Sequence, residues 1–174
     1  MHSIPVIETE RLILRSFQER DLDAFAAINA DPLVMMYLGD GKPVERSFTW
    51  RQMASFIGHW ELRGYGVWAV KEKSSGEFVG RVGLWYPDGW PDLEVIWTIA
   101  RSRWGKGYAP EAARESIRYA FEVLKADHVM SLIRPNDQKS IRVAGKVGER
   151  YDRQIGASGN PTNVYLLNRG DWRR

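Results

Sequence analysis

One stretch decides the fold: Arg103-Trp104-Gly105-Lys106-Gly107-Tyr108-Ala109-Pro110-Glu111-Ala112. It stands between an apolar run that predicts a strand, residues 93–99, and the longest predicted helix of the chain. Two glycines let backbone N–H groups converge, and the first turn of a helix adds unpaired amides and the positive end of its dipole. Pro110 fits that first turn because a proline has no N–H to leave unpaired. The stretch therefore predicts a binding site for phosphate groups.

Two familiar phosphate-binding motifs do not fit this stretch. A Walker loop needs a glycine, four residues and then Gly-Lys-Ser/Thr, whereas Ala100 stands at its first place and Gly107 follows Lys106. A dinucleotide fingerprint needs a small residue where Pro110 stands, and it belongs to the first strand of a repeated strand-helix-strand fold. A Gly-rich turn without any ligand remains the alternative interpretation.

Segments of strand and helix periodicity surround the stretch. Strands are expected at residues 12–14, 67–70, 78–85, 93–99, 129–133, around Tyr151 and at 164–167, and helices at residues 21–30, 47–64, from the Gly-rich turn to Leu124 and at 140–147. We expect Asp31-Pro32 to end the first helix and Ser47 to cap the second. This order of elements predicts a mixed α/β (α+β) domain in which an antiparallel meander precedes a strand-helix-strand unit.

The composition excludes several classes of protein. The 174 residues include no Cys, which excludes disulfides, thiolate zinc sites and a Cys nucleophile. The three His residues are not spaced as metal ligands, so we expect no metal site. A net charge of +3 is weaker than the basic face of a dedicated nucleic-acid-binding protein. No apolar run reaches the ~18 residues of a membrane-spanning helix and no secretory leader is recognised, so we expect a cytoplasmic protein without membrane association.

Five blocks of sequence stand in a characteristic order. They are Glu8-Thr9-Glu10-Arg11-Leu12-Ile13-Leu14-Arg15, Phe78-Val79-Gly80 with Gly83, Glu94-Val95-Ile96-Trp97, Trp104 to Ala112, and Ser140-Ile141-Arg142-Val143-Ala144 with Lys146 and Gly148. Together they resemble the GNAT superfamily of acyl-CoA-dependent N-acyltransferases, particularly the branch of ribosomal-protein-alanine acetyltransferases. The resemblance implies a single GNAT-like domain over residues 1–174, with a mixed, mostly antiparallel central sheet flanked by helices, and acetyl-CoA as co-substrate.

The resemblance also implies which residues bind acetyl-CoA. The family's pyrophosphate signature, Gln/Arg-x-x-Gly-x-Gly/Ala, matches Gly107 and Ala109, with Trp104 at the place of Gln or Arg. A second family pattern, Pro-x-Asn-x-x-Ser, is represented by residues 135–140, where either Asn136 or Asp137 takes the place of its Asn. The cofactor-binding residues implied in this way are Thr98, Ile99, Trp104, Gly105, Lys106, Gly107, Tyr108, Ala109, Asn136 and Asp137.

Transfer of an acyl group from a thioester to an amine needs a base for the ammonium, donors for the oxyanion and a proton for the thiolate. Glu94 is a lone carboxylate in an apolar strand, where burial would raise its pKa toward neutrality, and it matches the carboxylate that many family members use as base. The alternative is a strand Glu paired with an Arg across the sheet. The resemblance suggests a backbone N–H near Thr98 for the oxyanion.

Ser140 is the candidate acid that protonates the thiolate, with Tyr151 behind it. Many relatives use a Tyr in the short helix, where this chain has Ala144. The simpler interpretation of Ser140 is the N-cap of that helix. A CoA thiol also leaves well enough to make such an acid nonessential.

The expected acceptor is a small-molecule or peptide amine. An aromatic and acidic mouth for a cationic amine would consist of Tyr37, Trp50, Trp60, Trp85, Trp90, Asp88 and Asp92, unless these are loop and core residues. The competing function is a non-catalytic module that binds CoA, RNA or the ribosome. A homodimer is left open.

Overall fold

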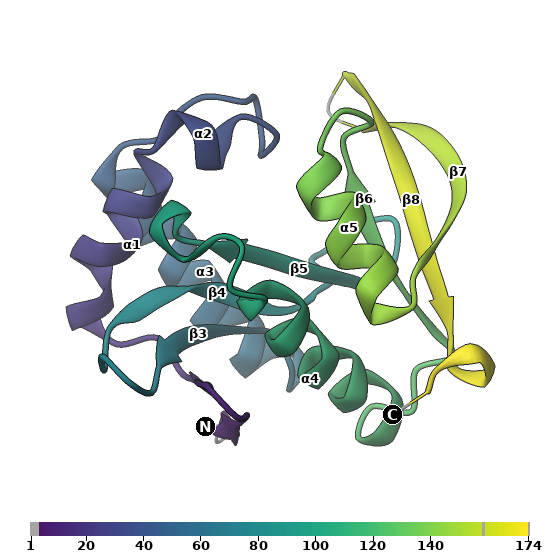
Figure 1. Ribbon diagram of the computed structural model, residues 1–174, viewed down its shortest axis with the longest axis horizontal. Coiled ribbons are helices and arrows are strands. Elements are labelled where there is room, and N and C mark those ends of the chain that lie inside the picture. The colour runs from purple at the N-terminus through teal and green to yellow at the C-terminus, as the bar shows by residue number, and fades with distance from the viewer. Residues whose placement is uncertain (1–3, 158, 174) are drawn as a thin grey trace.

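One sheet runs through the part of the chain that the computed structural model describes, residues 4–157 and 159–173 (Figure 1). Its strands follow the order β1-β2-β3-β4-β5-β6-β8-β7, and all neighbours are antiparallel except the parallel pair β5 and β6. The strands are β1 (Ile7–Glu8), β2 (Leu12–Arg15), β3 (Val67–Glu72), β4 (Phe78–Trp85), β5 (Glu94–Ile99), β6 (His128–Ile133), β7 (Arg150–Ala157) and β8 (Asn160–Asn168). The prediction of a mixed, mostly antiparallel sheet is confirmed.

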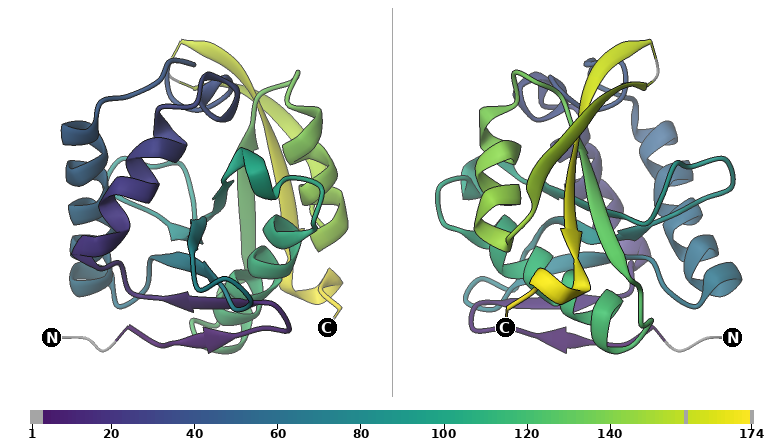
Figure 2. Two further views of the ribbon diagram at one scale, coloured as in Figure 1. Left: turned by 60° about the vertical axis from the view of Figure 1, so that its left-hand side comes forward. Right: turned by 90° about the vertical axis from the view of Figure 1, so that its right-hand side faces the viewer.

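Helices cover both faces of this sheet. They are α1 (Leu22–Asn29), α2 (Pro32–Met35), α3 (Arg46–Arg63), α4 (Tyr108–Glu122) and α5 (Gln138–Val147), with 3-10 turns at Glu19–Asp21, Arg101–Arg103 and Arg169–Asp171. Figure 2 shows α1 and α3 together on one side of the molecule, and α4 and α5 on the other. None of the helices in the described ranges is both long enough and apolar enough to cross a membrane.

The two faces bury two separate cores. One contains the apolar face of α4, with Ala113 and Ile117 fully buried against the sheet. The other contains Phe17, Phe25 and Phe56, whose rings pack against one another between the sheet and helices α1 and α3. Because side chains alternate along a strand, each central strand contributes to both cores and thereby positions residues on both faces.

The segment Asp31-Pro32 has two functions, of which the sequence analysis recognised one. It ends α1 as predicted, but it also begins the unpredicted helix α2. An Asp31 carboxylate oxygen accepts the N–H of Leu33 at 2.9 Å, and Pro32 takes the first helical position. The prediction that Ser47 caps the next helix is wrong, because α3 begins at Arg46 with Glu45 before it.

Two tryptophans belong to the core. Trp60 and Trp68 are 1% and 0% exposed, and their rings meet edge to face at 4.9 Å. The indole N–H of Trp60 donates to the carbonyl oxygen of Val67 at 3.0 Å, so the buried polar group is satisfied. The core interpretation is therefore correct for Trp60, which takes no part in an acceptor mouth.

Strands β3 and β4 approach closely at Gly83. A Cβ at this position would lie 2.4 Å from the Cα of Val67 and 2.5 Å from the carbonyl oxygen of Gly66. Both contacts are with backbone atoms, so no side-chain rotation relieves them. Gly83 also pairs with Ile96 of β5, and the same residue therefore sets how three strands come together.

We expect Gly83→Ala to destabilise the chain by about 3 kcal/mol, the upper part of the range for overpacking. This corresponds to a fall in Tm of roughly 6–12 °C. Gly156→Ala in β7 is the matched control, because a Cβ there meets nothing within 4 Å, and its Tm should stay near that of the wild type. Thermal unfolding measures both, and equal Tm values for the two variants would contradict the close approach.

Candidate active site

Strands β5 and β6 are joined at one point and then part. The register pairs only Glu94 with Met130. At the next place in the ladder a side chain replaces the backbone, because the N–H of Leu132 donates to Oε1 of Glu94 at 3.1 Å. Similarly, the Ser131 hydroxyl donates to the carbonyl oxygen of Val95 at 2.8 Å. Side chains thus fill the split, and the edge of β5 beyond it is not paired with β6.

The backbone of Trp97 lies on this open edge. The carbonyl oxygens of Val95 and Ile99 accept hydrogen bonds from the same side, that of Ile99 from the Trp104 indole at 2.8 Å. Backbone N–H and C=O groups alternate between the two edges of a strand in an antiparallel ladder. The backbone groups of Trp97 therefore point away from β4, as those of Val95 and Ile99 do, and the backbone groups of Thr98 point toward β4. A backbone N–H near Thr98 that faces the split therefore belongs to Trp97 or Ile99.

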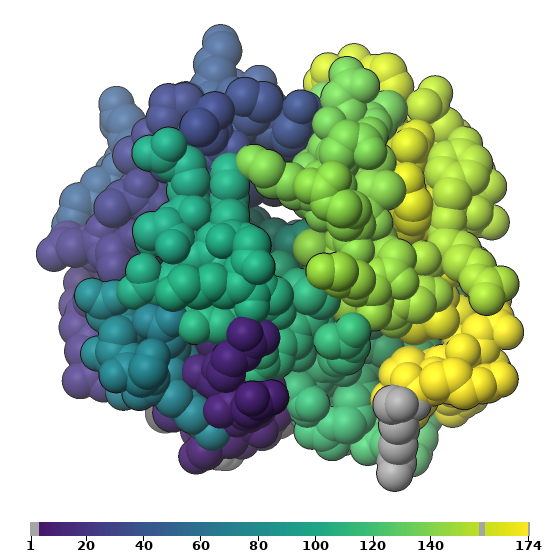
Figure 3. Space-filling model, viewed as in Figure 1, coloured from purple at the N-terminus to yellow at the C-terminus, as the bar shows by residue number. Residues whose placement is uncertain are grey.

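A cleft of about 460 Å³ lies where the strands part. Its walls are the end of β5, the Gly-rich turn, the starts of α4 and α5, and α2 with the residues after it. Figure 3 shows the surface hollowed between α5 and the segment that leads into α4. At one end, Arg134 donates to the carbonyl oxygen of Gly39 at 2.7 Å and so connects the loops that follow β6 and α2.

Most of the predicted site residues meet at this cleft. Those that line it are Thr98, Ile99, Trp104, Gly105, Gly107, Tyr108, Ala109, Asn136, Asp137 and Ser140. Lys106 and Glu94 do not line it. The Lys106 ammonium lies 3.7 Å from Glu72, and Glu94 stands at the split itself, three residues before Trp97.

The Gly-rich turn presents free amides at the start of α4. Gly105 and Gly107 have φ angles of +79° and +81°, in the left-handed region that favours glycine, and Gly107 immediately precedes the helix. Within residues 4–157 and 159–173, no acceptor satisfies the backbone N–H groups of residues 105–109. These donors, with the dipole of a 15-residue helix behind them, form an anion-binding geometry.

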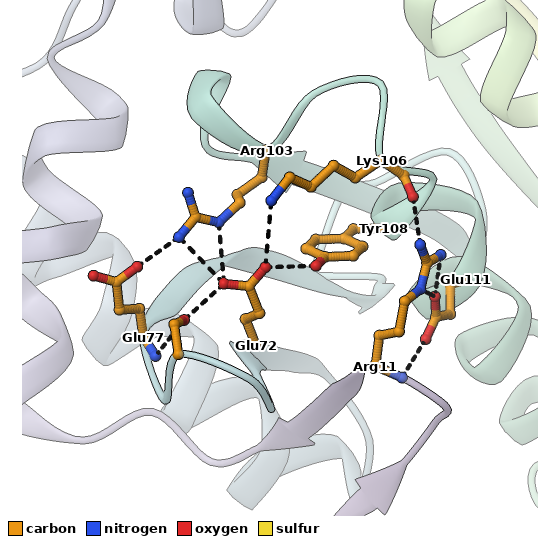
Figure 4. A network of polar contacts seen from close by, with 8 residues as sticks. Arg11, Glu72, Glu77, Arg103, Lys106, Tyr108 and Glu111 are labelled. Atoms are coloured by element: carbon orange, nitrogen blue, oxygen red, sulfur yellow. Dashed lines mark hydrogen bonds and ion pairs between the residues drawn. The ribbon is translucent and has the colours of Figure 1, made fainter.

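Ion pairs hold the turn from its inner side (Figure 4). Arg11 of the loop before β2 donates to the carbonyl oxygen of Lys106 at 2.7 Å and pairs with Glu111 of α4 at 2.5 Å. The Thr9 hydroxyl donates to the same carboxylate at 2.6 Å. Hydrogen bonding and the Arg11 charge lower the pKa of Glu111 against the effect of its burial. The carbonyl of Lys106 is thereby directed inward.

Glu72, at the end of β3, anchors the other side of the turn (Figure 4). Its carboxylate accepts the Tyr108 hydroxyl at 2.5 Å and the Ser75 hydroxyl at 2.6 Å, and Arg103 lies at 3.2 Å. These two hydrogen bonds, more than the neighbouring cations, lower the pKa of Glu72 to about 2. Sequence reasoning missed this residue, because a polar residue at a strand end is typical of solvent exposure, whereas Glu72 is buried.

Glu94 is the buried carboxylate of the site, with 6% of its surface exposed. The Trp90 indole donates to its Oε2 at 2.8 Å, and the Leu132 amide donates to its Oε1. Burial raises the pKa of Glu94 to about 7, against the opposing effects of these hydrogen bonds and of the Arg81 charge. The alternative of a strand Glu paired with an Arg across the sheet is met in part, because the charge of Arg81 on the neighbouring strand β4 acts on Glu94, although no salt bridge joins them.

A second buried carboxyl, Glu149 after α5, lies next to the split. The Ser131 oxygen is 2.8 Å from the Val95 carbonyl oxygen and 2.9 Å from Oε1 of Glu149. The Val95 carbonyl can only accept, so the single hydroxyl proton of Ser131 goes to the Val95 carbonyl oxygen. The contact between the Ser131 oxygen and Glu149 is then a hydrogen bond when Glu149 is protonated and donates. Burial accordingly raises the pKa of Glu149 well above its ordinary value.

Asp137, not Ser140, caps α5. The Asp137 carboxylate accepts the N–H of Ser140 at 3.0 Å, and the helix begins at Gln138, two residues earlier than predicted. The N-cap interpretation of Ser140 is therefore wrong, and its side chain is placed at the cleft instead. Tyr151 is 56% exposed on β7 and lines a different groove.

The residues predicted as an acceptor mouth lie in separate places. Tyr37 lines the cleft and Trp90 contacts Glu94, but Trp85 packs against Phe56 and His59 beneath α3. Asp92 pairs with His128 at 2.6 Å, and Trp50 is exposed on the outer face of α3. No group of three potential metal ligands occurs in the described part of the chain.

Comparison with known proteins places this geometry in a family. A family model described as an acetyltransferase (GNAT) domain matches residues 11–150. The chain belongs to the GNAT acetyltransferase family. It is thus an acyl-CoA-dependent acetyltransferase, and the resemblance inferred from the five blocks of sequence is confirmed at the level of the family.

Relatives of this GNAT acetyltransferase match it over nearly its whole length. The protein YkkB of Bacillus subtilis is 33% identical over 174 residues, covering 95% of this chain and 96% of the relative. An acetyltransferase structure from Agrobacterium tumefaciens is 29% identical, with a TM-score of 0.84 and 95% of each chain covered. A ribosomal-protein-S5-alanine acetyltransferase from Vibrio fischeri has a TM-score of 0.74 over 98% of this chain and all of its own, but at 16% identity that likeness shows the fold alone.

Burial of Glu94 predicts a pH-dependent stability. A carboxyl with a pKa of about 7 when folded and about 4.5 when unfolded binds more protons in the folded state between those pH values. Its contribution to stability is therefore full below about pH 4.5 and is lost, by roughly 3 kcal/mol, as the pH rises through 7. Glu94→Gln removes this pH-dependent contribution to stability. The difference between the Tm of the variant and the Tm of the wild type should therefore rise from pH 5 to pH 8.

Thermal unfolding of both proteins across this range measures the difference. The charge of Glu94 also raises the pKa of Glu149, so the same comparison in a Glu149→Gln background isolates the titration of Glu94. A Tm difference that stays constant from pH 5 to pH 8 would show that Glu94 titrates at its ordinary pKa.

Proposed function

We propose that this chain transfers the acetyl group of acetyl-CoA to a primary amine, by direct attack of the amine on the thioester. The observation that carries the proposal is the position of Glu94. It is a buried carboxylate with a pKa near 7, it stands at the split between β5 and β6, and the cleft beyond it ends at the free amides of the Gly-rich turn. The proton-accepting carboxylate and the anion-binding turn thus lie before and after the open edge of β5.

The residues of the cleft fit the chemistry of CoA. The amides of residues 105–109 would hold the diphosphate, and Asn136 is available beside the arm because Asp137 is engaged in capping α5. Lys139 adds positive charge at the mouth, where its ammonium lies 3.5 Å from the centre of the Trp104 ring. Acetyl-CoA supplies the activated acyl group and the leaving thiolate.

The proposed proton transfers follow from the same arrangement. Ionised Glu94 takes one proton from the ammonium, directly or through a water molecule, and the neutral nitrogen attacks the thioester carbonyl carbon. The N–H of Trp97 or Ile99 on the open edge of β5 donates to the oxyanion. The C–S bond then breaks, and the thiolate takes the second amine proton through Ser140 or solvent. An ammonium and a thioester thus become an amide, a thiol and one released proton.

The diphosphate site is tested at Gly107. Gly107→Val places a branched side chain among the free amides, so we expect the Kd for CoA to rise at least about 10-fold. Gly64→Val is the matched control, because Gly64 ends α3 with a φ of +76° and carries the same backbone strain away from the cleft. Calorimetric titration with CoA measures both. Unchanged affinity in a folded Gly107→Val variant would place CoA elsewhere.

The base is tested with Glu94→Gln, which keeps the shape of the side chain but accepts no proton. We expect kcat to fall by about 10²–10⁴, with CoA affinity within about twofold of the wild type. A base works in its ionised form, so the wild-type rate should rise with pH through about 7, and the variant should lack this limb. Release of free thiol in the presence of a panel of amines measures the rate.

Glu149→Gln is the matched control for this experiment. It removes a second buried carboxyl, whose pKa burial raises well above its ordinary value, so both the rate and the pH limb should persist. A Glu94→Gln enzyme that works at the wild-type rate at every pH would make Glu94 structural. A wild-type protein that binds CoA but releases no thiol with any amine would instead be a non-catalytic binding module.

A further inference from the structure

Arg81 of β4 is a buried cation whose charge interacts with that of Glu94 but which forms no salt bridge with a described carboxylate. It is 8% exposed, and neither its Nε nor its Nη1 has a hydrogen-bond acceptor among the described residues. Its guanidinium carbon lies 5.2 Å from the centre of the Phe56 ring, and no carboxylate is within salt-bridge distance. A buried donor left unpaired destabilises the folded state, and a charged donor does so more strongly. Groups kept in this state indicate a partner that is absent from the protein itself.

A second unpaired polar group lies beside Arg81. The strand register places Arg81 directly opposite Thr98 of β5, so both side chains are on the same face of the sheet. The Thr98 hydroxyl is also buried and has no described hydrogen-bond partner. Thr98 lines the cleft, which connects the pair to the proposed reaction site. A guanidinium and a hydroxyl thus converge at one place with their donors unused.

The same face carries the proposed base. Glu94 and Ile96 precede Thr98 by four and two residues, so all three side chains point to the side of α1 and α3. Four residues of strand span about 13 Å between Cα atoms. Ile96 and Trp85 are only partly buried although both lie on central strands, which shows that the space over this face is not sealed. An acceptor that reached both Glu94 and Arg81 would lie over Ile96 on this face.

We propose that Arg81, assisted by the Thr98 hydroxyl, binds a carboxylate of the amine acceptor, which is therefore an amino acid with its amine at Glu94 and its acid group at Arg81. The inference rests on the proposed function. A planar guanidinium matches the two oxygens of a carboxylate, and one positive charge balances one negative charge. A phosphate dianion would carry a second charge that Arg81 alone does not balance.

The test uses acceptors in matched pairs. Straight-chain amino acids with two to six carbons between the amine and the carboxylate are compared with alkylamines of the same length and with aminoalkyl phosphates. For the best chain length we expect the wild-type kcat/KM to favour the carboxylate over both partners by at least about 30-fold. Arg81→Met should lose this preference through a higher KM for the carboxylate acceptor, with rates compared on the pH plateau of each protein because the Arg81 charge also lowers the pKa of Glu94.

Two further variants separate recognition from structure. Arg81→Lys keeps the charge but not the planar fork, so it should retain part of the preference. Thr98→Val removes only the hydroxyl, and it should reduce the preference for the carboxylate acceptor over the alkylamine by about 3–10-fold. Methionine replaces an unpaired buried charge with an apolar side chain of similar length, so the Tm of Arg81→Met should equal or exceed that of the wild type.

Each outcome decides the inference separately from the proposed function. Amine acetylation without any preference for a carboxylate overturns the inference and leaves the proposed function in place. Equal losses for all acceptors in Arg81→Met also overturn it, because Arg81 would then act on structure. If no amine is acetylated, calorimetry with a straight-chain carboxylic acid still decides: binding to the wild type that weakens at least about 10-fold in Arg81→Met supports the inference, and no binding refutes it.

Discussion

The site depends on one hydrogen bond, from the amide of Leu132 to the side chain of Glu94. In a regular parallel ladder that amide would bond to a backbone carbonyl and hold β5 and β6 together. A carboxylate in its place keeps the amide satisfied while the strands part. The same substitution leaves the edge of β5 beyond it unpaired and buries a carboxylate at the point of separation. The opening and the proposed base are therefore consequences of a single residue.

Residues far apart in the sequence hold the two ends of the cleft in position. The Gly-rich turn is fixed by Arg11 of the loop before β2 and by Glu72 at the end of β3, both of which lie earlier in the chain. The proposed acceptor end is formed by α1 and α3 over β4 and β5, and it contains two unpaired polar groups, Arg81 and Thr98. The side chains that hold the turn are thus paired before any ligand arrives, whereas the side chains of Arg81 and Thr98 retain unsatisfied donors. Arg11 and Glu72 thus stabilise the turn, and Arg81 and Thr98 are left to bind the proposed acceptor.

Sequence reasoning predicted the parts of the structure that local signals determine. The periodicity of β4, β5 and α4 and the glycines of the turn indicated the fold and the end of the cleft at the turn. The prediction was incomplete where one sequence motif can either end or begin a helix, as at Asp31-Pro32, which ends α1 and begins α2. It also missed Glu72 and Arg81, because their burial follows from packing between distant segments. The pairing of Arg81 with Thr98 depends on strand register, which composition and spacing do not reveal.

The single register pair between β5 and β6 has a mechanical consequence. The sheet consists of two parts, β1 to β5 and β6-β8-β7. Within each part, antiparallel ladders hold the strands together by hydrogen bonds. The seam between the two parts is one residue pair long, and α4 packs across it against β4, β5 and β6. Because the two parts of the sheet meet at only one residue pair, a small rotation between them produces a large change in the distance across the cleft. We therefore expect the width of the cleft to change more readily than any other dimension of the domain, by rotation of the two parts of the sheet about α4.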